Sequence, residues 1–304
     1  MTVRRDALRR AFGTCTGRGG RRDGRRLRWL GGGLLALGAG LAATSVLGPL
    51  VTGVIKYRVT DLMVSQLKGA DAVSLFVVAP GCIALGIAAL RGHRMAAPLA
   101  LGPAAYTVYM AAEVIIGPDY AGIPGNVERF FPLLIGLFAG AGAVAVAAWT
   151  MTEPSALPAL SVRRARVTGG VLVVAAVLLM VGRYVPALSD VMSDHPASAA
   201  YLASPTIFWT IALEDLGIVI PTMFVAGIGT WRRDRWAARA RVAVVGWSAL
   251  VPPAVVTMAI FMYADGQPTA SLPDIAVLSA LALVMLVPAV LCYEPLVRKA
   301  PDVR

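Results

Sequence analysis

The sequence predicts an all-α protein, a polytopic bundle of eight transmembrane helices. Of its 304 residues, 58% are hydrophobic and 15% are charged, and the mean hydropathy is +0.72. A soluble domain carries roughly 25% charged residues, which this chain does not approach. Several runs of about 20 apolar residues follow one another, each long enough to cross a bilayer as a helix. The lipid bilayer is therefore the expected partner.

The first 28 residues form a basic tail before the first apolar run. They include ten arginines and, after Phe12, almost no apolar side chains. A segment of this composition cannot bury a core, so we expect residues 1–28 to be a disordered cytoplasmic tail. Its charge fits a signal that sets membrane orientation, and contact with anionic lipid headgroups is a further expected role.

Eight apolar spans follow, four in each half of the chain. The first half covers residues 29–151 and the second half covers residues 167–293. Residues 152–166 form a basic cytoplasmic loop between the halves, and residues 294–304 form a cytoplasmic C-terminus. The predicted spans are 29–55, 73–90, 95–117, 130–151, 167–188, 205–231, 242–264 and 272–293.

The connections between the spans alternate in charge. Arginine gathers at 91–94, 163–166 and 231–241, whereas 189–204 and 265–273 contain no lysine or arginine. Basic connections stay on the cytoplasmic side, so we expect both termini in the cytoplasm and the protein in the cell membrane. This topology accounts for the net charge of +11 without a nucleic-acid partner.

A shift of 141 residues superposes the first four spans roughly on the last four. Four spans return the chain to its starting side, so such halves share one orientation, as in a parallel four-plus-four repeat. The alternative is that apolar spans ending in arginine match by chance. The matched pairs are Pro80 with Pro221, Gly86 with Gly227, Ile87 with Ile228, Arg91 with Arg232 and Arg94 with Arg235.

The sixth span carries the strongest functional signal, two adjacent carboxylates inside an apolar run. Ionisable residues are costly within a membrane and mark functional sites by default. Asp215 lies near the middle of the span, where a carboxylate must be protonated, paired or exposed to an aqueous cavity. Pro221 lacks an N–H and leaves the carbonyl of Gly217 without its helical partner, which predicts a kinked helix with a polar notch.

Two interpretations of these carboxylates stay open. Asp215 either binds a proton or cation, or forms an interhelical hydrogen bond that holds the bundle together. Glu214 is turned from Asp215 by about 100° around the helix, and the structural interpretation is favoured there. As the hydrogen-bond partner of Asp215 we expect Tyr106 or Tyr109 of the third span.

Further polar groups are expected at the same depth, in the outer half of the membrane. Tyr106, Tyr109 and Glu113 share one face of the third span because of their spacing. Asp71 is placed at the outer start of the second span, and Arg183 near the outer end of the fifth. Together these groups predict a polar pocket open to the cell exterior, with Arg183 as counter-ion. The alternative is that Arg183 and Glu113 reach the membrane interface and the tyrosines only pack.

No residue pattern predicts a cofactor, a metal or a known catalytic site. The two histidines, His93 and His195, fall in connections expected on opposite sides of the membrane. The three cysteines give no disulfide or metal framework. The sequence contains no Walker A, metalloprotease, nucleophile-elbow or potassium-filter motif. An enzyme is therefore the less favoured interpretation.

Short motifs occur in both halves. They are Lys68-Gly-Ala-Asp71-Ala-Val-Ser-Leu75, Pro80, Arg91-Gly92, Tyr106-x-x-Tyr109, Glu214-Asp215-Leu-Gly-Ile-Val-Ile-Pro221 and Trp231-Arg232-Arg233. Over residues 56–241 this pattern resembles a family of multi-pass membrane proteins from bacteria, mainly actinobacteria, described only as hypothetical proteins. The chain departs from the family pattern at 119–129, where Asn126 sits in a longer loop. Because the family has no established activity, the resemblance implies membership without a mechanism, and it marks Asp71 and Asp215.

Three functions remain open from the sequence. The first is a structural or accessory membrane protein without a ligand. The second is a small-solute or proton-linked transport or binding protein with an outward-facing polar site around Asp215. The third is a membrane-embedded enzyme that uses Glu214 or Asp215 as general acid or base on a lipid-like substrate. The absence of a cavity favours the first, a cavity open to water favours the second, and a pocket reaching lipid favours the third.

Overall fold

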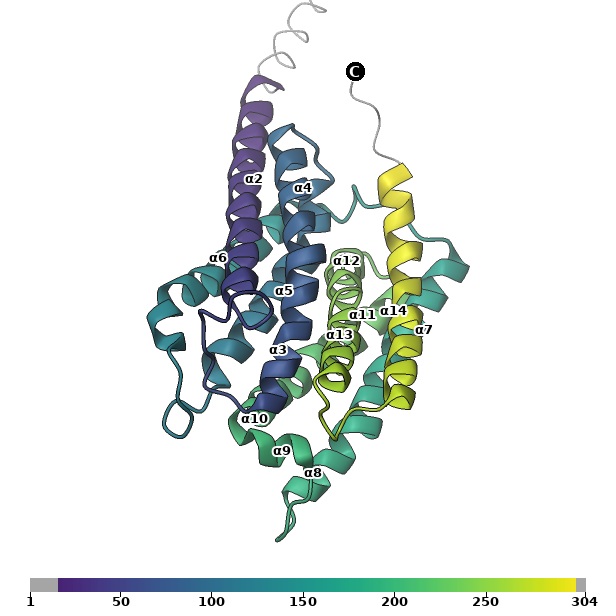
Figure 1. Ribbon diagram of the computed structural model, residues 1–304. Helices are drawn as coiled ribbons and strands as arrows, with labels where there is room; N and C mark the ends of the chain where they lie inside the picture. Colours follow the sequence, from purple (N-terminus) through teal and green to yellow (C-terminus); the bar gives the residue numbers. More distant parts are fainter. Residues whose placement is uncertain (1–15, 299–304) are drawn as a thin grey trace, which may run out of the picture.

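The computed structural model describes the backbone of residues 16–298 and the side chains of residues 24–296. Over this range the protein is helical, and the described residues contain no strand. Eight helices are long and apolar enough to cross a membrane, which confirms the predicted eight-span bundle (Figure 1). Large apolar side chains such as Phe76, Leu213 and Leu283 are exposed on the bundle, as expected for an integral membrane protein in contact with lipid.

The first half contains four spans with one interrupted helix. Span one is α2 (Thr16–Leu47), and span three is α5 (Ala96–Ile116). Span two consists of α3 (Asp61–Val73), the π-helical turn η1 (Ser74–Val78) and α4 (Ala79–Leu90). Span four consists of the short 3₁₀ helix η2 (Val127–Phe130) and α6 (Phe131–Met151).

Three of the four spans in the second half are interrupted. Span five consists of α7 (Val162–Val177), the π-helical turn η3 (Leu178–Tyr184) and α8 (Val185–Val191). After the short helix α9 (Ala199–Ala203), span six consists of α10 (Pro205–Glu214), the π-helical turn η4 (Asp215–Val219) and α11 (Ile220–Arg232). Span seven consists of α12 (Ala237–Ser248) and α13 (Val251–Ala264), and span eight is α14 (Leu272–Arg298).

The first span ends earlier than the sequence predicts. Its helix ends at Leu47, and not at residue 55. Pro49 follows two residues later and cannot donate a helical hydrogen bond. Gly53 then turns the chain with a φ of 62°, a left-handed conformation that favours glycine.

The second span is longer than predicted, because it begins at Asp61 and not at residue 73. The charged side chains of Lys68 and Asp71 suggest a loop when only composition is considered. In the structure Lys68 forms an ion pair with Asp265 and Asp71 lines a cavity. Neither charge therefore faces lipid, and the helix continues through both positions. Asp71 lies inside the second span, which corrects its predicted position at the outer start.

The basic tail also differs in part from the prediction. Helix α2 begins at Thr16, so residues 16–28 are helical where their composition predicts disorder, and residues 1–15 lie outside the described range. A helix that is stabilised within the apolar span can extend into polar sequence, because each further residue adds a backbone hydrogen bond after nucleation. Arginine is also a good helix former.

Each of the three π-helical turns ends two residues before a proline, namely Pro80, Pro186 or Pro221. Proline has no N–H, so the carbonyl four residues before it loses its α-helical partner. The residue directly before each proline donates to the carbonyl five residues back. These bonds run from Ala79 to Ser74, from Val185 to Met180 and from Ile220 to Asp215. At the place of the predicted kink, the sixth span therefore has a π turn that begins at Asp215.

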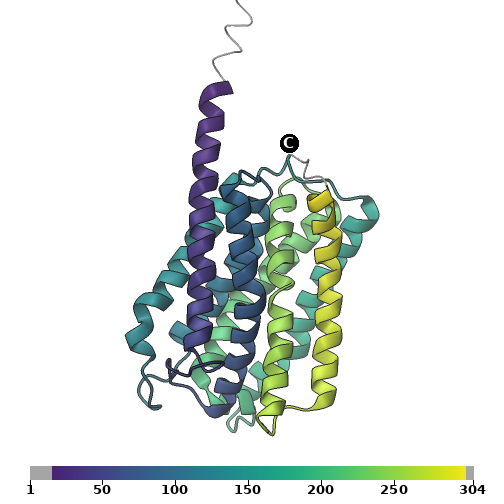
Figure 2. The same ribbon diagram turned by 45° about the horizontal axis from the view of Figure 1, so that its top comes forward.

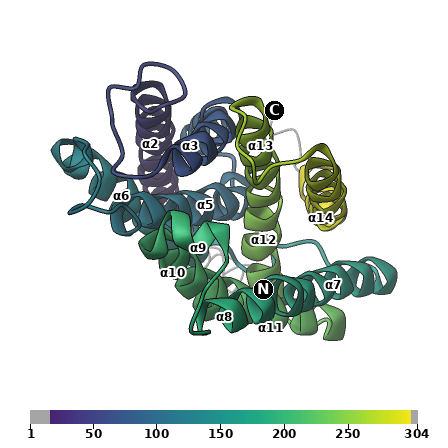
Figure 3. The same cartoon turned by 60° about the horizontal axis from the view of Figure 1, so that its bottom comes forward.

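The two halves make equivalent helix contacts. Helix α2 packs on α4 and α6, and its counterpart α7 packs on α11 and α14. Helix α5 packs on α6 and α10, and its counterpart α13 packs on α14 and α3. Figure 3 shows α5 and the pair α12 and α13 in the middle, between the outer helices of both halves. The turns η1 and η4 are 141 residues apart, so this arrangement matches the four-plus-four pattern of the sequence.

The described ends of the chain lie at one end of the bundle (Figures 1 and 2). Each span crosses the bundle once, so the arginine-rich connections lie at this same end. Exposed tryptophans accompany them, at Trp29, Trp231 and Trp236, while Trp209 and Tyr263 are exposed towards the opposite end. Aromatic residues gather at both interfaces of membrane proteins, so this distribution fits a bundle that spans the bilayer from end to end.

Candidate functional site

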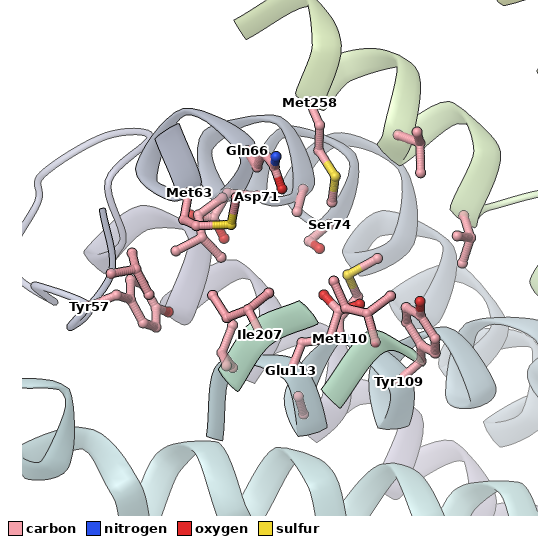
Figure 4. Close-up of a pocket in the computed structure, with 18 of the residues that line it drawn as sticks. Tyr57, Met63, Gln66, Asp71, Ser74, Tyr109, Met110, Glu113, Ile207 and Met258 are labelled. Carbon is pink, nitrogen blue, oxygen red and sulfur yellow. The ribbon is translucent and has the colours of Figure 1, made fainter. Parts of the chain in front are cut away.

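A cavity of about 450 Å³ lies between the spans. Its lining includes connections at the end of the bundle opposite the described ends of the chain. Residues from all eight spans line it, together with Tyr57, Pro118 and Thr269 from the connections at that end. Most of its lining is apolar. Figure 4 shows Asp71 and Ser74 on the wall formed by α3 and η1, with Tyr109 and Glu113 on the wall formed by α5.

Asp215 is held by two tyrosine hydroxyls and an arginine. The hydroxyl of Tyr184 donates to Asp215 Oδ2 at 2.5 Å, and that of Tyr109 donates to Asp215 Oδ1 at 3.1 Å. The guanidinium of Arg183 lies 3.8 Å from Oδ2. Asp215 itself is only 3% exposed. Both carboxylate oxygens therefore have partners, which is how a buried carboxylate is tolerated.

The partners of Asp215 come from three spans. Tyr109 is one of the two partners expected from the sequence, and Arg183 is the expected counter-ion. Tyr184 was not predicted, because it follows Arg183 directly and neighbours on an α-helix point about 100° apart. Both residues fall in the π turn η3, which widens the helix and brings their side chains to the same carboxylate. The signal available in the sequence was Pro186, which follows this turn.

Two glutamates stand close to this group. Glu113 lines the cavity, and its charge interacts with Asp215 and Arg183. It also approaches the Tyr109 hydroxyl, whose single proton is directed to Asp215. Glu214 is buried, and its Oε2 has no hydrogen-bond partner. The hydrogen bond that the structural interpretation assigns to Glu214 is therefore missing at that oxygen. We call Glu113, Glu214 and Asp215 with Arg183 the acidic cluster.

Arg183 lies at the border of the cavity and pairs only loosely with Asp215. Its side chain is 52% exposed, in contrast to the 4% of Asp215. The guanidinium also lies over the ring of Tyr184, 5.2 Å from the ring centre, a cation–π contact. The acidic cluster thus has three carboxyl groups and one cation, with the cation at the cavity wall.

Tyr106 does not belong to this cavity, which corrects the predicted pocket. Its side chain is fully buried, and its hydroxyl lies 3.0 Å from Ser74 Oγ and donates to the Ala70 carbonyl at 3.4 Å. Tyr106 and Tyr109 share a helix face by spacing, but the third span crosses the second at Tyr106 and the sixth at Tyr109. Tyr106 therefore links spans two and three in the core.

Asp71 stands apart from the acidic cluster, on the α3 wall of the cavity. Its Oδ2 is buried without a hydrogen-bond partner, and so is the Oγ of Ser45 on α2. The Ser45 hydroxyl faces the Asp71 carboxylate and interacts with it favourably, although the pair lies outside ordinary hydrogen-bond geometry. Among the described residues, no cationic side chain forms an ion pair with Asp71. The predicted site residues therefore fall into two groups.

The rim of the cavity is held by polar contacts between the connections. Asn126 accepts from the backbone N–H of Lys56 at 2.8 Å and donates to the carbonyl of Val54 at 2.9 Å. Arg58 forms an ion pair with Glu128 at 2.6 Å. Asn126 thus fastens the connection between spans three and four to that between spans one and two.

The connection between spans seven and eight is fastened to the second span. Asp265 accepts hydrogen bonds from Lys68 at 2.8 Å and from Ser65 at 2.7 Å. Both bonds lower the pKa of Asp265, and the bond from Lys68 has the larger effect. We call these contacts of Asp265 with Lys68 and Ser65 the clasp. The clasp lies at the edge of the cavity, where Thr269 and Ala270 join the cavity lining.

The chain matches no protein-family model, no curated protein and no solved structure. Its resemblance to the bacterial membrane-protein family therefore stays a prediction. Among the side chains of residues 24–296, no three His, Cys, Asp or Glu residues are grouped so that they could hold a metal ion. The chemistry available at the site is that of carboxyl groups, phenols and one guanidinium.

Proposed function

We propose that this integral membrane protein binds or transports a small solute in a proton-linked manner, with the solute in the cavity. The observation that carries the proposal is a cavity lined by all eight spans, with the carboxyl groups of Asp71 and Glu113 in its walls. The volume falls within the range of small-molecule sites. A purely structural bundle needs no such cavity, so the ligand-free interpretation is less well supported.

The link to protons rests on the charge balance of the acidic cluster. Three carboxyl groups share one guanidinium, and an unpaired carboxylate inside a membrane is costly. Protons are the simplest counter-charge for the other two. Glu113 lies at the cavity, and Tyr109 stands between Glu113 and the buried Asp215. A proton from the cavity can therefore pass from Glu113 to Tyr109 while Tyr109 passes its own proton to Asp215.

The test is a screen of thermal unfolding with protein in lipid nanodiscs. The probes share one aromatic body: phenethylamine as cation, phenylacetate as anion, phenylalanine as zwitterion and phenethyl alcohol as neutral compound. At about ten times its Kd, a bound probe raises the Tm by about 3 °C. We expect one class to do so with different strength at about pH 5 and about pH 8, and Asp215→Asn to fold normally and lose this difference.

Proteoliposomes with a trapped pH dye then separate transport from binding. A transported probe should change the internal pH in the wild type and not in Asp215→Asn, whereas a probe that only binds should change it in neither. Asp194→Asn serves as control, since Asp194 is exposed and outside the cavity lining. The proposal fails when no probe class raises the Tm at either pH. It also fails when Asp215→Asn keeps the full pH dependence.

A membrane-embedded enzyme acting on a lipid-like substrate is the second candidate, and the site supports it less. Its general acid or base would be Glu214 or Asp215. Both oxygens of Asp215 are occupied by tyrosine hydroxyls, and the side chain is 96% buried. A carboxylate this deeply buried is not accessible to a substrate in this arrangement.

We further place the protein in a bacterial cell membrane, with both termini in the cytoplasm. The support is the position of the arginine-rich connections at the end of the bundle that also holds the described ends of the chain, as the positive-inside rule requires. Under this orientation the cavity faces the cell exterior. Reporter fusions at Gly125 and Asp234 should read outside and inside, respectively, and the same reading for both would exclude the topology.

A further inference from the structure

We propose that Asp71, Ser45 and the ring of Tyr57 form the subsite for a protonated amine of the solute. This inference rests on the proposed function and names the class of ligand. Asp71 Oδ2 and Ser45 Oγ are buried polar atoms of the cavity wall without hydrogen-bond partners. A buried acceptor without a partner costs free energy comparable to a lost hydrogen bond. An ammonium group supplies donors for both atoms at once.

The charge at this end of the cavity selects a cation. No ion pair joins Asp71 to a lysine or arginine within the described part of the chain. Arg183 contacts Asp215 instead, on the other wall. An ammonium is therefore attracted to Asp71 and repelled from Arg183, which orients the solute along the cavity.

Ser45 is the second, independent feature of this subsite. Its side chain is 1% exposed, yet its hydroxyl oxygen has no hydrogen-bond partner. A hydroxyl side chain inside a helix can bond to the carbonyl four residues back, as Thr210 does with Thr206. The Ser45 hydroxyl faces the Asp71 carboxylate, and its oxygen keeps lone pairs that can accept a bond from an N–H donor.

Tyr57 adds an aromatic wall. It is 8% exposed and lines the cavity, and Figure 4 shows its ring beside Met63 and Asp71. Burial and the nearby Asp71 charge raise the pKa of Tyr57, so the phenol stays neutral. A neutral tyrosine ring beside a carboxylate attracts a cation through its face.

The apolar part of the lining favours an organic cation over a bare metal ion. Gln66 and Ser74 add oxygen atoms near Asp71, whereas Met63, Met258 and Val255 in the same cavity offer no oxygen ligands. Hard metal ions need six or more oxygen ligands or retained waters. Methionine instead adapts to apolar bodies of various shapes. An amine on an apolar body uses both the acidic end and the apolar walls.

The test measures binding by calorimetry in nanodiscs at about pH 8, where an alkylamine is still protonated. Phenethylamine should bind, and phenylacetate and phenethyl alcohol should not. Asp71→Asn should weaken phenethylamine about thirtyfold, the effect of removing one partner of a buried charge pair. Asp194→Asn, which removes the same charge from an exposed loop on the same side, should bind as the wild type does.

Two further pairs of measurements resolve the parts of the subsite. Tyr57→Phe keeps the ring and should keep the affinity, whereas Tyr57→Leu should weaken binding about fivefold. Phenethyltrimethylammonium has the charge but no N–H, so it should bind less tightly than phenethylamine and should be insensitive to Ser45→Ala. The Ser45 and Tyr57 variants keep the test valid when Asp71→Asn does not fold.

The outcomes separate this inference from the proposed function. The inference is overturned when phenethylamine binds Asp71→Asn as tightly as the wild type. It is also overturned when phenethylamine binding is lost in Asp215→Asn instead, because the amine then does not bind at Asp71. When only phenylacetate or phenylalanine binds, with a pH dependence that needs Asp215, the proposed function stands and the inference falls. When no probe binds, both fall.

Discussion

At the scale of single residues, the carboxylate of Asp215 connects three spans. It accepts from Tyr184 and Tyr109 and lies near Arg183. Asp215→Leu should leave two phenol hydroxyls without their acceptor and lower the free energy of unfolding by about 1–2 kcal/mol, the scale of interhelical hydrogen bonds in model peptides. Asp215→Asn keeps the shape and one acceptor oxygen and should be close to wild type.

Urea or thermal unfolding in detergent measures both variants of Asp215. Tyr184→Phe is the matched partner variant. In a double-mutant cycle, Asp215→Leu and Tyr184→Phe together should cost less than the sum of the single changes, because they remove the same bond. Full additivity would show that the 2.5 Å contact contributes nothing to stability.

We expect Asp265, at the rim of the cavity, to make the stability of the protein depend on pH. Hydrogen bonds from Lys68 and Ser65 lower its pKa in the folded state. A lowered pKa means that the stabilisation is present above the unfolded value of about 3.9 and is lost as the pH falls towards the folded value. Asp265→Asn should therefore be less stable at neutral pH, by about 0.5 kcal/mol, the scale of partly exposed ion pairs.

The measurement is the Tm in detergent between about pH 3 and about pH 7. The wild type should lose more stability than Asp265→Asn on acidification, so the two curves converge at low pH. Asp194→Asn removes an exposed carboxylate outside the clasp and should keep the wild-type pH profile. Parallel curves for wild type and Asp265→Asn would contradict the assignment of the clasp.

At the scale of elements, the π turns decide where side chains point. In η4 the carbonyl of Asp215 accepts from Ile220, and Pro221 offers no N–H to the carbonyl of Gly217. Pro221→Ala restores that donor and makes an ordinary α-helical turn available. The residues before the turn would then rotate by about 100° relative to those after it. Asp215 would then no longer accept the hydrogen bond from Tyr184.

We therefore expect Pro221→Ala to lose stability and pH-dependent ligand response together. Adding Asp215→Leu to Pro221→Ala should lower the free energy of unfolding only slightly further, because Pro221→Ala has already removed the contacts of Asp215. Pro80→Ala alters the equivalent turn η1 without touching Asp215, so its effect should add to that of Asp215→Leu. An additive effect for Pro221→Ala would show that the π turn does not position the carboxylate.

At the scale of the whole molecule, glycines lie where equivalent helices of the two halves cross. A Cβ added to Gly86 would lie 3.0 Å from the carbonyl oxygen of Gly31, and one added to Gly227 would lie 3.0 Å from that of Gly169. The first pair joins α2 to α4 and the second joins α7 to α11. The crossing of spans one and two is thus equivalent to that of spans five and six.

This equivalence predicts matched effects in the two halves. Gly86→Leu and Gly227→Leu should each destabilise the bundle by about 1–3 kcal/mol, because the added side chain meets backbone. Gly140→Leu in span four is the control, since nothing lies within 4 Å of a Cβ there. Thermal unfolding in detergent measures all three. A loss at only one of the two crossings would contradict the four-plus-four repeat as a structural principle of this bundle.

The sequence by itself determined the membrane class and the eight spans. These properties depend on the local apolar content of about 20 residues and on the positions of arginine and proline, which are visible in the chain. Tyr109 as partner of Asp215 was also within reach, because the spacing of helix faces is fixed. The span containing Asp71 was placed too late, since Lys68 is paired by the distant Asp265 and Asp71 faces a cavity rather than lipid.

Only the tertiary structure decided which polar groups share a site. Tyr106 and Tyr109 are equivalent by spacing, yet Tyr106 meets Ser74 in the core and Tyr109 meets Asp215 beside the cavity. Tyr184 joined that site because a π turn changed the register of its helix. Burial of a charge depends on what neighbouring helices present to it, and helix packing brings together residues more than 100 positions apart, such as Tyr109 and Asp215. That information is absent from any local stretch of the chain.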